Sequence, residues 1–359
     1  MSPLLTAVAV GCVALLLGVV LTEPLRRFAL RYGITDRPNG HKGHARPTPY
    51  LGGIAVAVVT LAAGAVTAVA GDSGNPCLAV LLGGAAIMTV LGLIDDLRPL
   101  GPALRLGVEA AAASVVVLVG GHPTVFGGAF DAALAVVWIV FITNAFNLLD
   151  NMDGAASSLC AVIGGFLCWY AWLSGQTGLG VVLAALSGAC LGFLFHNWHP
   201  ARIFLGDSGS LFIGFTLASA AVVLHQDAAG LSVPAGLLAT TFVATVDTAL
   251  VMLSRYREAR PLLQGGQDHA SHRLRRIGLT VQQAVTVLGV FAGLGGLSGV
   301  LLAQGVLPPG VLLLAAVAVG VAAVALLLRV PSLPGPATSA ALPMGRTAGS
   351  SELTAARIR

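Results

Sequence analysis

The segment DAALAVVWIVFITNAFNLLDNMDG, residues 131–154, contains the two features that decide the fold. An apolar run long enough to cross a bilayer is followed directly by a polar stretch. A membrane-spanning helix needs about 20 mainly apolar residues, and such runs recur along the whole chain. Of its 359 residues, 56% are hydrophobic and only 9% are charged. Because soluble domains carry about 25% charged residues, the sequence predicts an all-α polytopic membrane protein.

The apolar pattern predicts about eleven transmembrane helices in one domain, residues 1–330. Residues 331–359 are rich in Pro, Gly, Ser and Ala without an apolar period, which predicts a disordered tail. We expect no cleaved signal peptide, because the first run lacks a basic leader and its arginines follow it. The expected spans are 2–22, 51–70, 78–94, 104–120, 131–148, 156–173, 178–196, 209–225, 232–253, 281–303 and 309–329.

The positions of Lys and Arg predict the orientation. Connections between eleven spans alternate between two faces, and all 19 Lys and Arg residues lie on one face or within about one helical turn of it. The positive-inside rule places that face in the cytoplasm, with the N-terminus outside and the C-terminus inside. The net charge of +4 is thus a topology signal, and no aromatic or RNA-binding pattern indicates a nucleic acid partner.

Most acids and several histidines gather on the same face, which a purely lipid-facing scaffold does not require. Asp95 and Asp96 end the third span within LGLIDDLRP. Adjacent carboxylates repel one another and favour a cation, and Mg²⁺ prefers such oxygen ligands. A solvated helix end beside Arg98 is the alternative. The sequence therefore predicts a functional site on this face.

A second polar motif ends the quoted segment. Asn147, Asp150 and Asp153 are spaced three apart, so one helical turn would place them on the same face. A simple loop is the alternative. Further along, Gly206 and Gly209 flank Asp207-Ser208. We expect these glycines to let backbone amides approach a phosphate, with Asp207 as a metal ligand or its charge-matched partner.

Histidines and arginines meet in DHASHRLRR, residues 268–276. His269 and His272 followed by Arg273 fit a diphosphate or uridine-phosphate site through charge-assisted hydrogen bonds. A zinc site lacks a matching second pair of ligands. The alternative for the arginines is that they only determine topology.

One further segment and two single acids also have predicted roles. HARPTPYLGG, residues 44–53, has prolines that prevent helix and two glycines that allow tight packing or close ligand approach. Glu109 lies four residues after Arg105, which predicts a structural ion pair. Asp247 lies inside the ninth span, where an acid costs about 2.5–3.5 kcal/mol to insert. We therefore expect it to face the bundle interior or a wet cavity.

Taken in this order, the motifs resemble those of the polyprenyl-phosphate N-acetylhexosamine-1-phosphate transferases. This family includes the phospho-N-acetylmuramoyl-pentapeptide transferase and several GlcNAc-1-phosphate transferases of bacterial envelope synthesis. The similarity runs from about Asp36 to Arg276 through five motifs. Each motif is weak alone, whereas the ordered set is specific. Members of the family have ten or eleven spans, in agreement with the prediction made from hydropathy.

The resemblance implies roles for individual residues. Paired aspartates act at the metal and lipid-phosphate site in the family, and the aspartate of the FxGDxGS motif ligates Mg²⁺. The NxxDxxD stretch lines the nucleotide-sugar site, and the asparagine of the NxxPA stretch contacts the nucleotide. We therefore predict catalytic roles for Asp95, Asp96, Asp150, Asp153, His269 and His272, substrate-binding roles for His44, Asn147, Asn197, Asp247 and Arg273, and metal binding by Asp207.

Two positions depart from the family pattern. The histidine motif HxHH reads His269-Ala270-Ser271-His272 here, so its middle histidine is Ser271. Asn151 replaces a frequent glycine in the NxxDxxDG region. Both departures leave the choice of sugar open, although the form NAFN is closer to the GlcNAc-1-phosphate branch than to the pentapeptide branch.

The implied reaction is attack of a lipid phosphate oxygen on the β-phosphorus of a UDP-sugar, which displaces UMP. GlcNAc-1-phosphate is the expected transferred group, and the product would start cell-envelope polysaccharide synthesis. The implied partners are a UDP-sugar, undecaprenyl or decaprenyl phosphate and the lipid bilayer, with Mg²⁺ or Mn²⁺ as cofactor. We expect a multi-pass protein of the bacterial plasma membrane with its site on the cytoplasmic face. A covalent aspartyl-phosphate path and a homodimer stay open.

Two other classes fit the sequence less well. A transporter would place its acids near the bilayer midplane in broken helices, whereas most acids here gather at one face. A CDP-alcohol phosphotransferase has a similar setting, but its DGxxAR…GxxxDxxxD signature is absent. Asp153-Gly154 leads instead into Ala-Ala-Ser-Ser.

Overall fold

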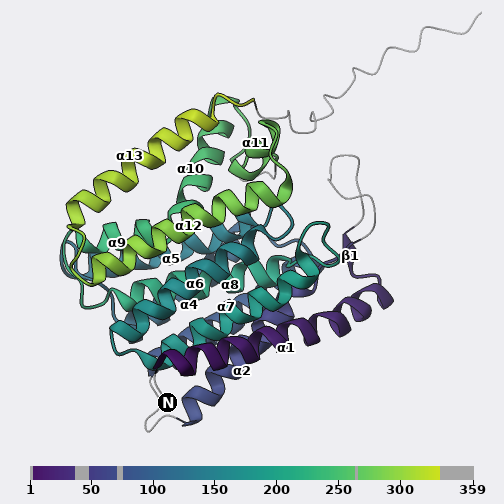
Figure 1. Cartoon of the computed structure of the whole chain (residues 1–359), viewed down its shortest axis with the longest axis horizontal. Coiled ribbons are helices and arrows are strands. Elements are labelled where there is room, and N and C mark those ends of the chain that lie inside the picture. The colour runs from purple at the N-terminus through teal and green to yellow at the C-terminus, as the bar shows by residue number, and fades with distance from the viewer. Residues whose placement is uncertain (1–2, 37–47, 71–75, 263–265, 332–359) are drawn as a thin grey trace, which may run out of the picture.

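The computed structural model describes residues 3–36, 48–70, 76–262 and 266–331, which form a bundle of helices with one two-stranded hairpin (Figure 1). Ten of the described helices are long and apolar enough to cross a membrane, and the number of spans is eleven if one bent pair of helices is counted as a single span. The predicted all-α polytopic fold is therefore confirmed. The long helices are α1 Pro3–Arg31, α2 Gly52–Ala70, α3 Pro76–Leu97, α4 Pro102–Gly120, α5 Ala129–Leu149, α6 Ala155–Leu173, α7 Thr177–Asn197, α8 Asp207–Leu224, α12 Val281–Ala303 and α13 Pro309–Leu327.

The ninth span differs from the prediction, because it is two helices rather than one. Helices α9 (Ser232–Thr240) and α10 (Phe242–Arg257) meet at an angle of 80°. The hydroxyls of Thr240 and Thr241 donate to the carbonyl oxygens of Gly236 and Leu237, at 2.9 and 2.7 Å. Side-chain bonds of this kind compete with the helical ladder and bend helices. The expected continuous helix over 232–253 was thus wrong at this break.

The first helix continues beyond its predicted end at residue 22 as far as Arg31. Glu23 explains the extension, since its carboxylate pairs with Arg26 and Arg27 at 2.8 Å each. Pairs three and four residues apart stabilise a helical turn. The short strands β1 (Thr35–Asp36) and β2 (Thr48–Pro49) follow and pair antiparallel.

Helix α8 is the centre of the bundle. In the most apolar stretch of α8, 94% of the residues are buried, whereas the corresponding share in the peripheral helix α13 is 6%. Helices α2, α3, α5 and α6 pack around it. Glycines permit this closeness, because a Cβ atom added to Gly53 would lie 2.2 Å from Cα of Gly209, and one added to Gly92 would lie 2.3 Å from the carbonyl oxygen of Asp207. The N-terminus of α8 is therefore pressed against α2 and the end of α3.

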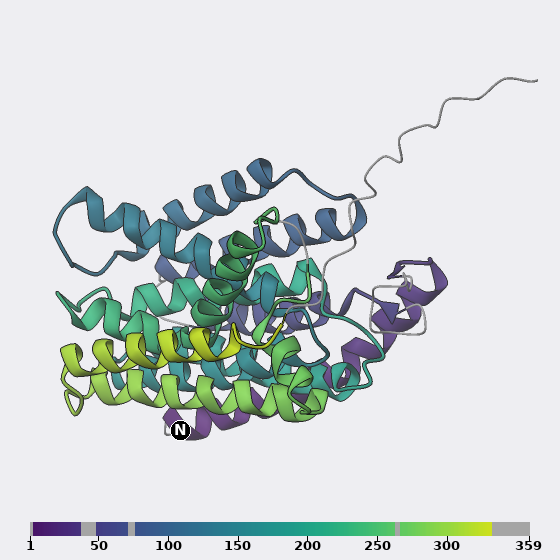
Figure 2. The same ribbon diagram turned by 90° about the horizontal axis from the view of Figure 1, so that it is seen from above.

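The two ends of the bundle differ in what they contain. At one end, helices α3, α5, α7 and α10 finish and helices α4, α6, α8 and α12 begin. We call this end the site face. The short helix α11 (Ala270–Arg276) and the hairpin lie toward it, as Figures 1 and 2 show. The other end, which we call the opposite face, has the loops after α4, α6, α8 and α12.

Candidate active site

A cluster of carboxylates lies on the site face around the first residue of α8. We call it the carboxylate cluster. One oxygen of Asp207 accepts a hydrogen bond from Nδ2 of Asn147 at 2.8 Å, and the other lies 3.5 Å from Nη1 of Arg105. Arg105 also donates from Nη2 to Oδ1 of Asn147 at 3.2 Å. Its guanidinium therefore ties α4 to α5 and α8. The members of the cluster are Asp95, Asp96, Arg105, Asn147, Asp150 and Asp207.

The adjacent residues Asp95 and Asp96 have separate partners. Oδ2 of Asp95 lies 2.5 Å from Nη1 of Arg105, whereas Asp96 accepts the backbone N–H groups of Asp207 and Ser208 at 2.9 and 3.1 Å. Neighbouring residues on a helix point about 100° apart, since a turn has 3.6 residues. Asp96 thus satisfies amides that the start of α8 leaves without helical partners.

This use of the α8 amides corrects one expectation. Gly206 and Gly209 were expected to let backbone amides approach a phosphate, but the amides of Asp207 and Ser208 are already bonded to Asp96. Gly206 instead allows a close contact inside the protein. Its φ is +75°, and an added Cβ would lie 2.6 Å from the carbonyl oxygen of Tyr50.

Asp150 lies directly after α5, which ends at Leu149. Burial raises the pKa of Asp150 well above its ordinary value, and the negative charges of Asp207, Asp96 and Asp153 raise it further. The chain turns after Asp150, so the expected helical turn carrying both Asp150 and Asp153 was wrong. Excess negative charge at this point favours a bound cation.

Asp153 belongs to a second contact, with the segment between α7 and α8. Its Oδ2 accepts the N–H of Ala201 at 3.0 Å and lies 2.7 Å from Nδ1 of His199. Asn197 stabilises the same region, since it accepts from the N–H of Gly154 and donates to the carbonyl oxygen of Ile203, both at 3.0 Å. Asn197 is 3% exposed, so its amide holds two loops together.

The histidine motif forms a second part of the site, residues 268–276, which we call the histidine arm. Asp247 in α10 is 1% exposed, which confirms that it faces the bundle interior. Its carboxylate accepts the N–H of Ala270 at 2.7 Å and lies 2.8 Å from Nδ1 of His269. The ring centroids of His269 and His272 are 6.1 Å apart. Burial lowers the pKa of His272 to about 4, and the positive charges of His269 and Arg276 act in the same direction.

Arg273 lies in the histidine arm but faces away from solvent. It is 1% exposed and donates to Oγ of Ser254 at 2.7 Å, to the carbonyl oxygen of Leu327 at 2.8 Å, and to that of Val330. These contacts fasten the end of α13 to α10. They indicate a structural role for Arg273 instead of the expected contact with substrate.

The two departures from the family pattern meet in space. Oγ of Ser271 donates to Oδ1 of Asn151 at 2.5 Å, across 120 positions of sequence. Nδ2 of Asn151 donates to the carbonyl oxygen of Leu148 at 2.7 Å. This contact joins the histidine arm to the loop that carries Asp150 and Asp153.

Sequence reasoning missed two residues of the site. Arg105 was expected to pair with Glu109, but its guanidinium contacts Asp95 and Asp207, while Glu109 accepts a hydrogen bond from Asn144. The i,i+4 spacing of Arg105 and Glu109 predicted the wrong partner, because Arg105 lies in the first turn of α4 and its side chain reaches α3 and α8. His199 lies two residues after Asn197, and that proximity was its only signal. The expected substrate contact of His44 lies outside the described residues.

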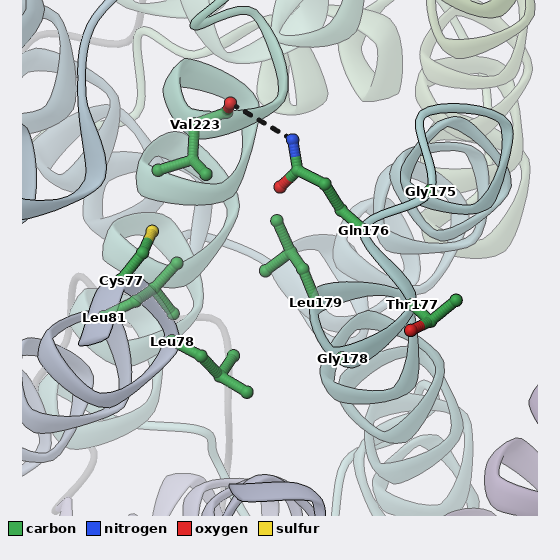
Figure 3. Close-up of a pocket in the computed structure, with 9 residues that line it drawn as sticks. All are labelled: Cys77, Leu78, Leu81, Gly175, Gln176, Thr177, Gly178, Leu179 and Val223. Carbon is green, nitrogen blue, oxygen red and sulfur yellow. Dashed lines mark hydrogen bonds between the residues drawn. The ribbon is translucent and has the colours of Figure 1, made fainter. Parts of the chain in front are cut away.

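The described residues contain two hollows that are separate from this site. A cavity of about 130 Å³ lies toward the opposite face, where Nε2 of Gln176 donates to the carbonyl oxygen of Val223 at 3.5 Å (Figure 3). It has no acid or histidine in its lining. A larger groove of about 640 Å³ lies between α10 and α13 and is mainly apolar, with Arg257 and Arg329 among its lining residues.

Comparison with known proteins identifies the family. The sequence pattern described as Glycosyl transferase family 4 matches residues 78–225. The chain is 41% identical over 288 residues to a protein of Streptomyces coelicolor that is named "Putative glycosyltransferase". The match covers 79% of this chain and 67% of that protein. It is 33% identical over 336 residues to the decaprenyl-phosphate N-acetylglucosaminephosphotransferase of Mycobacterium tuberculosis, covering 81% of each.

A third relative belongs to a different branch. The phospho-N-acetylmuramoyl-pentapeptide-transferase of Desulforamulus reducens is 34% identical over 245 residues, covering 60% of this chain and 72% of that protein. The matched pattern over 78–225 includes all members of the carboxylate cluster. Because the matches to the first two relatives, at 41% and 33% identity, extend over about four fifths of the chain, the chain belongs to glycosyl transferase family 4.

Proposed function

We propose that the chain transfers GlcNAc-1-phosphate from UDP-GlcNAc to a polyprenyl phosphate and releases UMP. At the coarser level it is a membrane transferase of N-acetylhexosamine 1-phosphate that acts on polyprenyl phosphate. The observation that carries the proposal is the cluster around Asp207, in which Arg105 and Asn147 hold a carboxylate at the start of the central helix. It provides a fixed, charged surface at one end of a membrane bundle.

The choice of sugar rests on the comparisons. The Mycobacterium tuberculosis relative, whose name specifies N-acetylglucosamine, matches 81% of this chain. The pentapeptide-transferase relative matches 60%. The form NAFN, residues 144–147, also favours the GlcNAc branch over the pentapeptide branch.

In the proposed reaction an oxygen of the acceptor phosphate attacks the β-phosphorus of the donor. A new P–O bond forms, the bond to the bridging oxygen breaks, and UMP leaves with that oxygen. Such transfers depend on positioning and on neutralising charge. Asn147 and Arg105 orient Asp207, and Asp247 orients His269 toward the same face. We propose that His269 and His272 contact the donor diphosphate.

We also propose a Mg²⁺ ion at the carboxylate cluster, held by Asp207 beside Asp150. Carboxylate oxygens are the donors that Mg²⁺ takes. The pKa of Asp150 is raised by burial first and then by the negative charges of Asp207, Asp96 and Asp153, and a cation would offset those charges. The described residues contain no group of three or more His, Cys, Asp or Glu side chains arranged to hold a metal ion. Arg105 supplies the neutralising charge beside Asp95 and Asp207. When bound, Mg²⁺ neutralises charge on the diphosphate.

Asn197 and Arg273 have positioning roles in this proposal, because their polar atoms are bonded inside the protein. Asp95 and Asp96 likewise shape the cluster, through Arg105 and through the amides of α8. Asp153 is paired with His199. We propose that this pair lies beside the donor, because the side chain of His199 is 41% exposed.

We propose that the site face is cytoplasmic and that residues 1–330 form one transmembrane domain. The support is the distribution of all 19 Lys and Arg residues along the sequence. Single cysteines placed at Arg202 and at Gln304, which follows α12 on the opposite face, would test it in a variant without the natural cysteines. Reaction of the residue 202 thiol with a membrane-impermeant maleimide in intact cells would refute the orientation.

The activity is tested with purified protein, radiolabelled UDP-GlcNAc, undecaprenyl or decaprenyl phosphate and Mg²⁺. We expect label in the lipid extract and an equal amount of released UMP. If a lipid product formed only with another UDP-N-acetylhexosamine, the transferase assignment would stand and the assigned sugar would change. Absence of a lipid product with every donor and both acceptors would refute the transferase assignment.

A further inference from the structure

The contact between Asn151 and Ser271 joins the two parts of the site. Asn151 stands between Asp150 of the carboxylate cluster and the Asp153–His199 pair. Ser271 stands between His269 and His272. The hydrogen bond between them, at 2.5 Å, therefore links the acidic loop to the histidine arm.

Both side chains are held in one orientation. The carboxamide of Asn151 donates to the carbonyl oxygen of Leu148 at 2.7 Å, which leaves its oxygen to accept from Ser271. Ser271 is 1% exposed, so its hydroxyl has no water to replace Asn151. A buried polar group that loses its partner costs about 1–3 kcal/mol. The pair is thus a defined link between the two segments.

The size of the two side chains also matters. With Ser271 1% exposed, an imidazole at position 271 has no room while the carboxamide of Asn151 stays in place. A glycine at position 151 would remove that carboxamide and open the space. The two side chains are therefore complementary in size in this chain: the carboxamide of Asn151 fits against the small side chain of Ser271.

We propose that Asn151 and Ser271 are a positioning pair that sets donor specificity, by fixing the separation between the acidic loop and the histidines that face the donor. This proposal rests on the proposed function. The ligand class that it concerns is the N-acetylhexosamine portion of a UDP-sugar. The pair acts through its neighbours and takes no proton in the reaction.

The test compares Ser271→Ala, Asn151→Gly and the double variant Ser271→Ala/Asn151→Gly. Both single variants remove the bond between the two side chains, and Asn151→Gly also removes the bond to Leu148. We expect Ser271→Ala to raise the KM for UDP-GlcNAc about tenfold and Asn151→Gly to raise it at least as much, with kcat within about threefold of the wild type. The double variant should be no worse than Asn151→Gly alone, since the bond between the side chains is lost only once. We also expect the preference for UDP-GlcNAc over its C4 epimer UDP-GalNAc to change.

A reciprocal exchange tests the steric part. Ser271→His alone should lose more than about tenfold in kcat/KM, and Asn151→Gly/Ser271→His should recover most of that loss. Ser298→Ala is the matched control, because it removes a serine hydrogen bond, to Leu294 at 2.8 Å, on an exposed part of α12. It should leave KM and donor preference unchanged.

Calorimetric binding of UDP-GlcNAc to every variant separates this proposal from the proposed function. If the wild type binds donor but forms no lipid product, the function is wrong, and the pair is still judged by the dissociation constants. If the increases in KM of the two single variants multiplied in the double variant, to near a hundredfold, the proposal of a positioning pair would be overturned. Unchanged KM and donor preference in all variants would overturn it as well. Absence of donor binding by the wild type would overturn both.

Discussion

Asp131 and Asp207 both lie in the first turn of a long helix, on opposite ends of the bundle. Asp131 is 3% exposed and accepts the N–H groups of Gly127, Val125 and Phe126 at 2.7, 2.9 and 3.0 Å. All three partners are backbone amides within six positions of sequence. This carboxylate closes a local loop, and its hydrogen-bonding capacity is used there.

Asp207 is bonded differently. Its side-chain partners are Asn147 and Arg105, which are 60 and 102 positions away in sequence, and its side chain is 34% exposed. Other carboxylates lie beside it. A carboxylate whose hydrogen-bond partners are all nearby backbone amides has a structural role. A carboxylate whose partners come from distant helices, and which stays accessible, is available for chemistry. The following substitutions test that distinction.

The largest effect is expected for Asp207→Asn. The change keeps the shape of the side chain but removes the negative charge with which Asp207, in the proposed function, holds Mg²⁺. We expect the rate of UMP release to fall by at least about 10²-fold, with thermal stability near that of the wild type. Turnover within about threefold of the wild type would contradict the role of Asp207.

Asp247→Asn should have the next largest effect. His269 would lose a charged hydrogen-bond partner that fixes its ring nitrogen, and such bonds contribute about 1.5–3 kcal/mol. We expect kcat/KM for the donor to fall about 10-fold to 100-fold. Steady-state kinetics with varied UDP-GlcNAc measures it, and an unchanged value would show that His269 does not need Asp247.

Asp131→Ala should reduce stability without reducing turnover. Three backbone amides would lose their acceptor, which costs about 1–3 kcal/mol for each amide that stays buried without a partner. Thermal unfolding in detergent should occur at a lower temperature, while turnover per folded molecule stays within about twofold of the wild type. A tenfold loss of turnover in folded protein would show that the opposite face contributes to the reaction.

The smallest effect is expected for a substitution of His272, and it concerns how thermal stability depends on pH. Burial lowers its pKa to about 4, below the usual value of about 6.5. The unfolded chain therefore takes up a proton before the folded protein does, and stability falls as pH decreases from about 6.5 toward 4. His272→Gln should remove part of this slope in thermal unfolding midpoints. Identical slopes in both proteins would contradict a neutral His272.

Much of the site could be anticipated because its residues end or begin apolar runs. Asp95, Asn147, Asp150 and Asp207 lie at such boundaries, and the helices place these boundaries at one end of the bundle. Their partners could not be anticipated. Arg105 has a plausible local partner in Glu109 but turns to Asp95, and Asp96 caps a helix more than 100 positions later in the sequence.

The break between α9 and α10 shows the same limit. Hydropathy over 232–253 is continuous, so the sequence predicts one helix. The threonine hydroxyls at 240 and 241 bend it through bonds that depend on the surrounding packing. The bend positions α10, and with it Asp247 against the histidine arm.

The sequence by itself determined the helical, membrane-spanning class of this protein, because backbone groups in lipid must be satisfied within their own segment and only long apolar helices achieve this here. It also determined which polar residues reach the helix ends. Only the tertiary structure decided which of them meet. Contacts such as Arg105 with Asp207 and Ser271 with Asn151 join residues 102 and 120 positions apart, and they form only where close packing brings those helix ends together.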